Sequence, residues 1–402
     1  MKNRIPLFYA VTAIFWFALY AYVPYVSPYG EYLGADLRMI GLIVGAYGFT
    51  QMLIRFPLGI LSDRLGKRKI FVLIGLLFTA ISGASVFFMP SPIALLLSRS
   101  FGGVAAATWV TFAILGASYY RPEDAAKSVG FLNSANALGR ILAFLAGGVI
   151  AQFIGVPFAF MLGGVAGVVG LIAGQWIKEG NKLHVSEDEF REDNTVNPPK
   201  ITDLILLVRN KQLLVASFMA ILCMYISFAT NFGFTPLLAE GMGANSFQLG
   251  MIGMTAALPG LIVSPLAGII FPKRLGNRNT ILMGFALTAI GCVLLVFVVD
   301  LWQLYAIQVI ISTGTSVAYT LLMGLSISDI PVKGRATAMG FFQAVYGLGM
   351  FVGPFVTGWV GYSFGLGVAF GVTSGVGALG MILAWIFITN RQKDGNNETK
   401  IS

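Results

Sequence analysis

The sequence predicts an all-α membrane protein whose twelve transmembrane helices form two similar halves of six. Apolar residues make up 57% of the 402 positions and charged residues 11%, whereas soluble domains average roughly 45 to 50% and 25%. Charged and Pro/Gly/Asn clusters divide the chain into about twelve apolar segments, most of them near the roughly 20 residues that a helix needs to cross the hydrocarbon core. The basic residues gather in alternate connections, as they do in multi-pass membrane proteins.

The segments are long, continuous and rich in Leu, Ile, Phe, Ala and Gly, without the alternation of barrel strands, so each is predicted to be a helix. In order, the expected spans are 6–28, 38–61, 70–89, 93–117, 131–154, 157–177, 212–238, 247–271, 280–299, 302–327, 336–360 and 366–389. The first segment lacks a small-residue cleavage site, so we expect it to remain as a span rather than to be removed as a signal peptide.

One long hydrophilic stretch, residues 178–211, interrupts this series. It divides the chain into an N-terminal six-helix bundle (1–177), a linker loop (178–211), a C-terminal six-helix bundle (212–390) and a tail (391–402). The two bundles resemble each other at a fixed offset of 210: RLGKR at 64–68 recurs as RLGNR at 274–278, and GFLNSANALG at 130–139 matches GFFQAVYGLG at 340–349. A shared register in two places indicates duplication. Parallel repeats of this kind predict a binding cavity between the halves near the middle of the bilayer.

The placement of the basic residues predicts the orientation. Every Lys and Arg lies at the N-terminus, in the linker, in the tail or in a connection on that same side, except Arg38, Arg55, Arg99 and Arg140. By the positive-inside rule, both termini and the linker are cytoplasmic and the protein lies in the cytoplasmic membrane. The formal net charge of +9 therefore reflects topology, and no nucleic-acid partner is expected.

The connection between the second and third spans carries a motif. Gly59, Asp63, Arg64, Gly66, Lys67, Arg68 and Lys69 fit the pattern G-x-x-x-D-R-x-G-R-[RK]-[RK], with Lys67 in place of Arg. This motif, together with the twelve spans, the central linker and the repeat, resembles the major facilitator superfamily over nearly the whole chain. The resemblance implies transport by alternating access, with these residues acting at the inner gate.

In that family, the acid of the motif latches the inner gate against the eleventh helix, which is expected to begin near Arg335. Gly59 would let the helices approach closely, and Asp63 would accept hydrogen bonds from Arg or from a helix N-terminus. The alternative is that the loop charges only set topology. In the second half, Lys273 stands where Asp63 would be, so a weaker latch is expected there.

Two further resemblances lie in the fourth and fifth spans. Arg99 and Gly103 with nearby Ala residues match the family pattern R-x-x-x-G-x-x-x-A. Residues 139–148, GRILAFLAGG, depart from the antiporter signature because Ala143 and Phe144 replace Gly-Pro, whereas GMFVGPFVTG at 349–358 stays closer to it.

Three arginines fall inside predicted spans, where a charge at the bilayer centre costs at least roughly 2.5 kcal/mol and usually has a function. Arg55 is expected to extend its head to the cytoplasmic interface by snorkelling, with a functional role as the alternative. Arg99 is expected to face the cavity, or otherwise to pack against backbone carbonyls. No acid is expected near the midplane.

Arg140 shares a helical face with Asn133 and Asn136, at positions i, i+3 and i+7. The matching positions of the eleventh span are Gln343, Tyr346 and Met350. Two polar stripes at equivalent positions predict a shared binding site lined by Arg99, Arg140, Asn133, Asn136, Gln343 and Tyr346. The alternative is hydrogen bonding that only joins helices.

Aromatic residues on the first and seventh spans are a second candidate wall of the site, although each of them also fits packing or an interfacial belt. They are Trp16, Tyr20, Tyr22, Tyr25, Tyr225 and Phe228.

The remaining chemistry-bearing residues exclude other functions. Cys223 and Cys292 fall in separate spans and are expected to be buried apolar residues, and His184 is the only histidine. No metal, cofactor or nucleophile–base arrangement is expected, and the protein is predicted not to be an enzyme.

We therefore expect a secondary active transporter of a small organic solute. Arginines without acids favour an anion. The expected partners are that solute, the lipid bilayer and a coupling proton or counter-anion, and the protein is expected to be a monomer. The alternatives are a proton-coupled multidrug or metabolite efflux antiporter and a membrane receptor or scaffold that does not transport.

Overall fold

The structure, a computed structural model, describes residues 5–120, 125–179, 210–331 and 334–388. Over these ranges the chain forms helices and no strand. Twelve helical spans are long and apolar enough to cross a membrane. The predicted all-α membrane fold is confirmed.

The first six spans contain α1 (Ile5–Tyr20), η2 (Val23–Tyr25), α2 (Val26–Tyr32), α3 (Leu37–Leu65), α4 (Arg68–Phe88), α5 (Pro92–Ala107), α6 (Trp109–Ala117), α7 (Ala125–Phe153) and α8 (Val156–Gly174). The last six contain α11 (Lys211–Ala229), η5 (Thr230–Phe234), α12 (Thr235–Gly241), α13 (Ser246–Ile269), α14 (Phe271–Leu294), α15 (Leu301–Ser328), α16 (Arg335–Phe364) and α17 (Leu366–Phe387).

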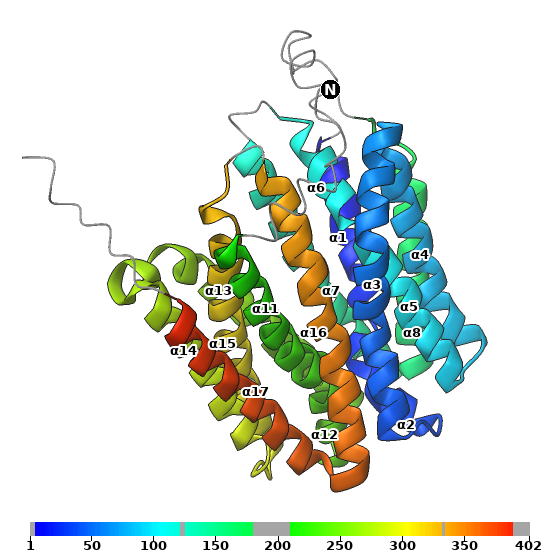
Figure 1. Cartoon of the computed structure of the whole chain (residues 1–402). Coiled ribbons are helices and arrows are strands. Elements are labelled where there is room, and N and C mark those ends of the chain that lie inside the picture. The colour runs from blue at the N-terminus through cyan, green and yellow to red at the C-terminus, as the bar shows by residue number, and fades with distance from the viewer. Residues whose placement is uncertain (1–4, 121–124, 180–209, 332–333, 389–402) are drawn as a thin grey trace, which may run out of the picture.

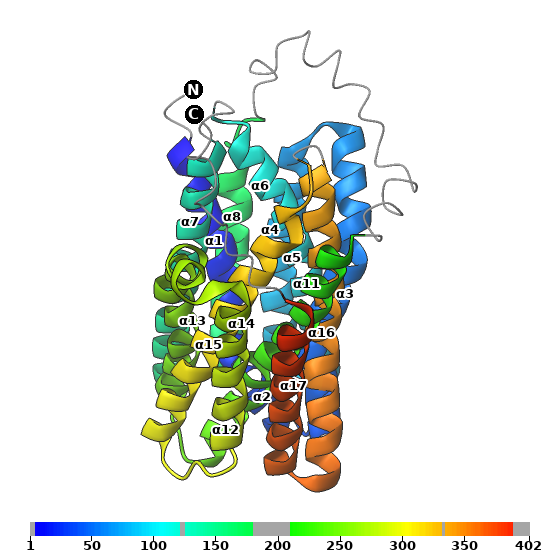
Figure 2. The same cartoon turned by 60° about the vertical axis from the view of Figure 1, so that its left-hand side comes forward.

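The two sets of helices form two bundles side by side (Figures 1 and 2). The N-terminal bundle packs α1, α3, α4, α5, α7 and α8 together, and the C-terminal bundle packs α11 and α13–α17. The bundles meet along two seams, α3 against α16 and α7 against α13. We call the side where α1 begins and α17 ends the terminal face, and the other side the opposite face.

The backbone confirms the internal repeat. All six described residues with a positive φ are glycines, and they form three pairs at nearly the expected offset of 210: Gly34 with Gly243, Gly66 with Gly276, and Gly155 with Gly365. A side chain strains this backbone region, which glycine adopts freely. Each pair lies where one span gives way to the next, so the two halves reverse direction by the same local geometry.

Several spans are interrupted in ways that the sequence did not predict. The first is broken by the 3₁₀ turn η2 around Pro24, the fourth divides at Thr108, and the seventh contains the π-helical turn η5. The ninth span was expected at 280–299, but α14 begins at Phe271 and kinks at Gly276. Because the backbone of Gly276 leaves the helical region (φ 80°, ψ 161°), the residues expected to form a loop consist of two helical segments that meet at this glycine.

Cys223 and Cys292 are buried free cysteines, as expected. Residues 180–209, which contain His184 and nearly all of the predicted linker, and residues 389–402, which contain the predicted tail, lie outside the described part of the chain.

Contacts between the bundles lie mainly toward the opposite face. A Cβ added at Gly41 would come within 2.5 Å of the Pro354 carbonyl oxygen, and one added at Gly45 within 2.9 Å of that of Phe351. Gly148 of α7 lies against Phe247 of α13 in the same way. Toward the terminal face, a Cβ at Gly59 or Gly340 would meet nothing within 4 Å beyond its own helix. The bundles are therefore joined at the opposite face and separate toward the terminal face.

Candidate functional site

Arg99 lies on a tyrosine ring at the centre of the molecule. Its side chain is 3% exposed, and its guanidinium carbon lies 4.5 Å from the centre of the Tyr47 ring. Gly103 sets this geometry, because a Cβ there would lie only 2.2 Å from the Tyr47 carbonyl oxygen. The Thr50 hydroxyl also donates to the Ser100 carbonyl at 2.8 Å. The close crossing of α3 and α5 thus brings the Arg99 head over Tyr47.

Arg140 is held in an equivalent way by α1 and α7. Its guanidinium carbon lies 4.5 Å from the centre of the Tyr20 ring. A Cβ at Gly139 would lie 2.2 Å from the Ala13 carbonyl oxygen, and one at Gly147 would lie 2.1 Å from that of Ala21. Both predicted arginines therefore rest on aromatic faces within their own bundle. Arg99 is buried, and a desolvated contact of this type is worth about 2 kcal/mol or more.

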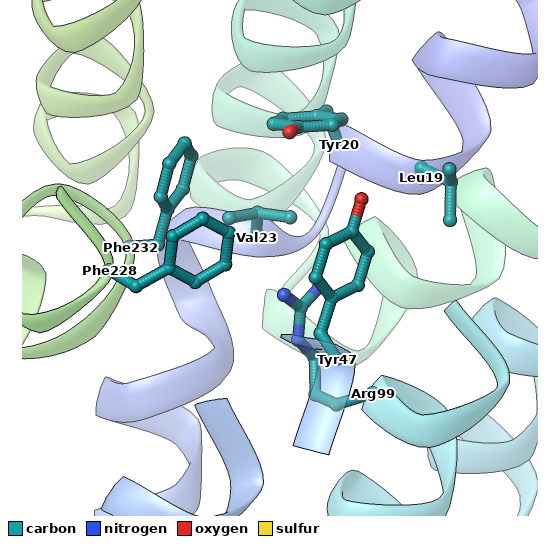
Figure 3. A pocket seen from close by; sticks show the side chains of 7 residues that line it. All are labelled: Leu19, Tyr20, Val23, Tyr47, Arg99, Phe228 and Phe232. Atoms are coloured by element: carbon teal, nitrogen blue, oxygen red, sulfur yellow. The ribbon is translucent and has the colours of Figure 1, made fainter. Parts of the chain in front are cut away.

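A pocket joins the two bundles at this level (Figure 3). About 200 Å³ of space lies among its lining side chains, but none of it is wide enough to hold a water molecule, so the site is closed in this conformation. The hydroxyl of Tyr47 points toward Tyr20, and the Arg99 head lies against the Tyr47 ring. The lining side chains are Leu19, Tyr20, Val23, Tyr47, Arg99, Phe228 and Phe232.

Among the residues that the structure describes, the positive charge at the centre has no acidic partner. An ion pair joins Arg38 to Asp36, but it lies near the opposite face, away from Arg99 and Arg140. The Nε atoms of Arg99 and Arg140 are buried and have no hydrogen-bond partner. A buried cation without a counter-charge is costly, so the arrangement favours an anion that would complete the site.

The expectation that Arg55 snorkels is wrong. Its side chain is 5% exposed, and it joins α3 to α16. One terminal nitrogen donates to Gln343 Oε1 at 2.9 Å and to the Tyr346 hydroxyl at 3.2 Å, and the other donates to the Ala106 carbonyl at 3.4 Å. Gln343 and Tyr346, expected to line the binding site, here hold an arginine of the other bundle.

The asparagine stripe remains a prediction. Asn133 is exposed and Asn136 is partly buried, and neither lines the central pocket. A second space, of about 280 Å³, lies between α1 and α7 nearer the terminal face. Tyr9, Ala10, Ala13, Phe131, Ser134, Ala135 and Leu138 line it.

The gate motif lies where α3 turns into α4. Gly66 adopts φ 61°, and the Arg68 guanidinium donates to the Ser62 hydroxyl at 2.8 Å. Glu179 accepts from the backbone N–H groups of Arg68 and Lys69, so the end of the sixth span holds the start of α4. These bonds fix the turn that carries Arg64 and Lys67, both of which are exposed.

In this conformation no other helix lies close to Gly59, because a Cβ added there would meet nothing within 4 Å. Helix α16 begins at Arg335, as expected, and Arg335 Nε donates to the Ile330 carbonyl at 3.1 Å. The Asp63 side chain lies outside the described part of the chain, so its role remains a prediction.

A clasp closes the opposite face. Arg38, at the start of α3, has its guanidinium carbon 3.9 Å from the Tyr362 ring centre and 5.8 Å from that of Trp359, both on α16. Asp36 holds the Arg38 head at 2.8 Å. The backbone N–H of Met39 and the Arg38 guanidinium lower the pKa of the Asp36 carboxyl. We name these four side chains, Asp36, Arg38, Trp359 and Tyr362, the outer clasp.

The sequence interpretation found part of this site. Among the residues that it proposed, Arg99, Tyr20 and Phe228 line the pocket and Arg140 lies over one of its rings. Two other suggested aromatics serve packing: the Tyr22 hydroxyl bonds Ser82 inside the N-terminal bundle at 2.6 Å, and that of Tyr25 donates to the Ser246 carbonyl at 3.1 Å.

Three residues were missed or misassigned. Tyr47 and Phe232 resemble many other aromatics of the apolar spans. The role of Arg55 could have been inferred from the two polar residues Gln343 and Tyr346, which lie on α16, the helix that α3 contacts in the other bundle.

Comparison with known proteins agrees with this architecture. The profile of the Major Facilitator Superfamily matches residues 8–286 and 217–401. An uncharacterized MFS-type transporter of Methanocaldococcus jannaschii is 27% identical over 338 residues, which cover 82% of this chain and 84% of that protein. The inner membrane transport protein YajR of Escherichia coli is 23% identical over 383 residues, or 92% and 78% of the two chains.

Solved structures share the fold. The nucleoside transporter NupG aligns with a TM-score of 0.79 at 15% identity, over 96% of this chain and all of that one. A D-xylose–proton symporter aligns with a TM-score of 0.77 at 14% identity, over 96% and 97%. The twelve spans, the two repeated bundles and the profile match over the chain lead to one conclusion: this protein belongs to the Major Facilitator Superfamily, whose members are multi-pass membrane transporters.

Proposed function

We propose that this protein is a secondary active transporter that moves a small organic anion across the cytoplasmic membrane by alternating access. The observation that carries the proposal is the charge of the central site. Arg99 is buried without an acidic partner at a pocket that both bundles line, and Arg140 lies on the Tyr20 ring of the same pocket. A carboxylate or phosphate would supply the missing counter-charge, and a guanidinium matches the planar geometry of such groups.

The distribution of basic residues makes the terminal face cytoplasmic in this proposal. The described conformation is then closed to the outside by the outer clasp and by the seams between the bundles. Opening of the opposite face would require the outer clasp to separate and the gate motif to close against α16. Arg99 and Arg140 would meet the solute at the level between these two gates.

Purified protein in proteoliposomes tests the proposal. We would measure uptake of a panel of radiolabelled small carboxylates and organophosphates, with and without a preloaded anion, at pH 5 to 8. We expect flux of at least one anion, and its loss in Arg99→Gln. Lys211→Gln removes an exposed basic residue at the terminal face, outside both copies of the gate motif, and should transport normally. Flux of lipophilic cations with no anion flux would instead favour multidrug efflux, and absence of any flux would favour a receptor or scaffold.

A further inference from the structure

The side chains of the central pocket point to a particular kind of anion. Four of the seven described lining residues are aromatic, two are aliphatic, and one is Arg99. Apart from that guanidinium, their only polar side-chain groups are the hydroxyls of Tyr20 and Tyr47. A solute with many hydroxyl groups would leave most of them without partners here, and a buried polar group without a hydrogen bond is costly. The pocket therefore suits a largely apolar body with one charged group.

The rings present faces and edges from both bundles. The Tyr47 ring lies nearly parallel to that of Phe228, with centroids 6.0 Å apart, and Tyr20 meets Phe232 edge to face at 6.1 Å. The ring centroids of Phe228 and Phe232 lie 4.8 Å apart. Aromatic rings prefer such offset and edge-to-face neighbours, so a flat ring that enters between the bundles could replace these contacts with equivalent ones.

We propose that the transported anion is a small aromatic carboxylate. Its carboxylate pairs with Arg99, and its ring lies among Tyr20, Tyr47, Phe228 and Phe232. In this conformation the lining side chains leave no room for a water molecule, so the ring would enter only when the two bundles move apart. This inference rests on the proposed function, because it assumes that Arg99 receives an anion.

Binding to the purified full-length protein tests the inference with three probes: benzoate, cyclohexanecarboxylate and D-xylose. The two carboxylates share size and charge and differ in the π-system. We expect benzoate to bind about tenfold more tightly than cyclohexanecarboxylate, because aromatic pairs add attraction beyond their buried area, and D-xylose not to compete.

Variants locate the effect. Phe228→Leu and Phe232→Leu should bring the two carboxylates to within about twofold of each other. Phe218→Leu, on the same helix but 52% exposed, should keep the tenfold preference. Arg99→Gln should lose both carboxylates. Each variant should elute from a size-exclusion column as a single peak, which checks that it is folded.

The outcomes separate this inference from the proposal beneath it. Equal affinities for the two carboxylates, both lost in Arg99→Gln, would overturn the aromatic inference and leave an anion carrier. A benzoate preference that persists in Arg99→Gln would overturn both, and so would binding of D-xylose in place of either carboxylate. No binding of either carboxylate to the wild-type protein would overturn the aromatic inference.

Discussion

The hydrogen bonds from Arg55 to Gln343 and Tyr346 should help to set the balance between the two transport conformations. They cross the α3–α16 seam at the last level where the two helices touch before they separate toward the terminal face. The double variant Gln343→Leu/Tyr346→Phe removes both acceptors and leaves the bond of Arg55 to Ala106, which lies within its own bundle.

The size of the shift follows from the type of bond. A hydrogen bond to a charged group contributes roughly 1.5 to 3 kcal/mol. We count the two bonds, to Gln343 and Tyr346, as one contribution of this size. In the open conformation, water or other groups would bond the Arg55 head and offset part of what is lost. Since 1.4 kcal/mol corresponds to a factor of ten, the ratio of the joined to the separated conformation should fall roughly 10- to 100-fold.

Distances between spin labels at Met89→Cys and Val299→Cys would report the shift. Both sites are exposed, at 72% and 74%, on the opposite face of different bundles. The native thiols, Cys223 and Cys292, are buried and should not take the label. The double variant should add or enlarge a population with a longer distance.

A double-mutant cycle with Arg55→Gln tests this prediction. If Arg55 acts through these two acceptors, combining the variants should add little to either alone. Leu348→Val, at an exposed position of α16, should leave the distances unchanged. Unchanged distances in Gln343→Leu/Tyr346→Phe, or effects that add fully with Arg55→Gln, would refute the reasoning.

Four further predictions follow from the gates and the site. Arg140→Gln should weaken anion binding at least tenfold. Arg140→Lys should weaken it less, because an ammonium keeps the positive charge but lacks the planar fork. Wild-type affinity of both variants in an equilibrium binding assay would contradict this. Tyr362→Leu should loosen the outer clasp and raise labelling of the opposite face about two- to fivefold, from a contact worth roughly 0.5 to 1 kcal/mol, whereas Tyr362→Phe should not. Asp63→Asn should lower transport severalfold with normal membrane insertion, and normal flux with normal accessibility of the inner cavity would argue against a latch. The lowered pKa of Asp36 means that its stabilising contacts are complete above the ordinary value near 4 and are lost as pH falls through the lowered pKa, so Asp36 should add no pH dependence to transport between pH 5 and 8. Asp36→Asn should loosen the outer clasp, as Tyr362→Leu does, without abolishing transport, and abolished flux would place a coupling acid there.

The fold was predictable because the membrane makes sequence patterns simple. Apolar length marks a span, and clustered charge marks its end, so the spans were recognised without knowledge of their packing. The exceptions are local. Pro24 in η2 and the π-helical turn at Thr230–Phe234 break helices inside apolar runs, where hydropathy does not change. The charged start of α14 is helical on both sides of Gly276, where the backbone breaks, although its composition is that of a loop.

The site was predictable only where a charge stood out against the apolar background. Arg99 and Arg140 were found in this way. Tyr20 was proposed only as one of six aromatic residues and Tyr47 was not proposed, because their contacts with the arginines depend on the close crossing of helices at Gly103 and Gly139. Arg55 shows the limit of reasoning from depth alone: its distance from the helix end suggested that the head would reach water, but polar groups of the neighbouring bundle lie nearer.

The three pairs of positive-φ glycines have a consequence for how this protein can diverge. They shape the reversals between spans in both halves, far from the pocket, so their replacement strains the chain whatever solute is carried. The pocket residues Phe228 and Phe232 are under a different constraint, because in the proposed function it is the solute that requires them to be aromatic. Among descendants that acquire a new cargo, we expect the paired glycines to persist while the rings around the pocket are exchanged.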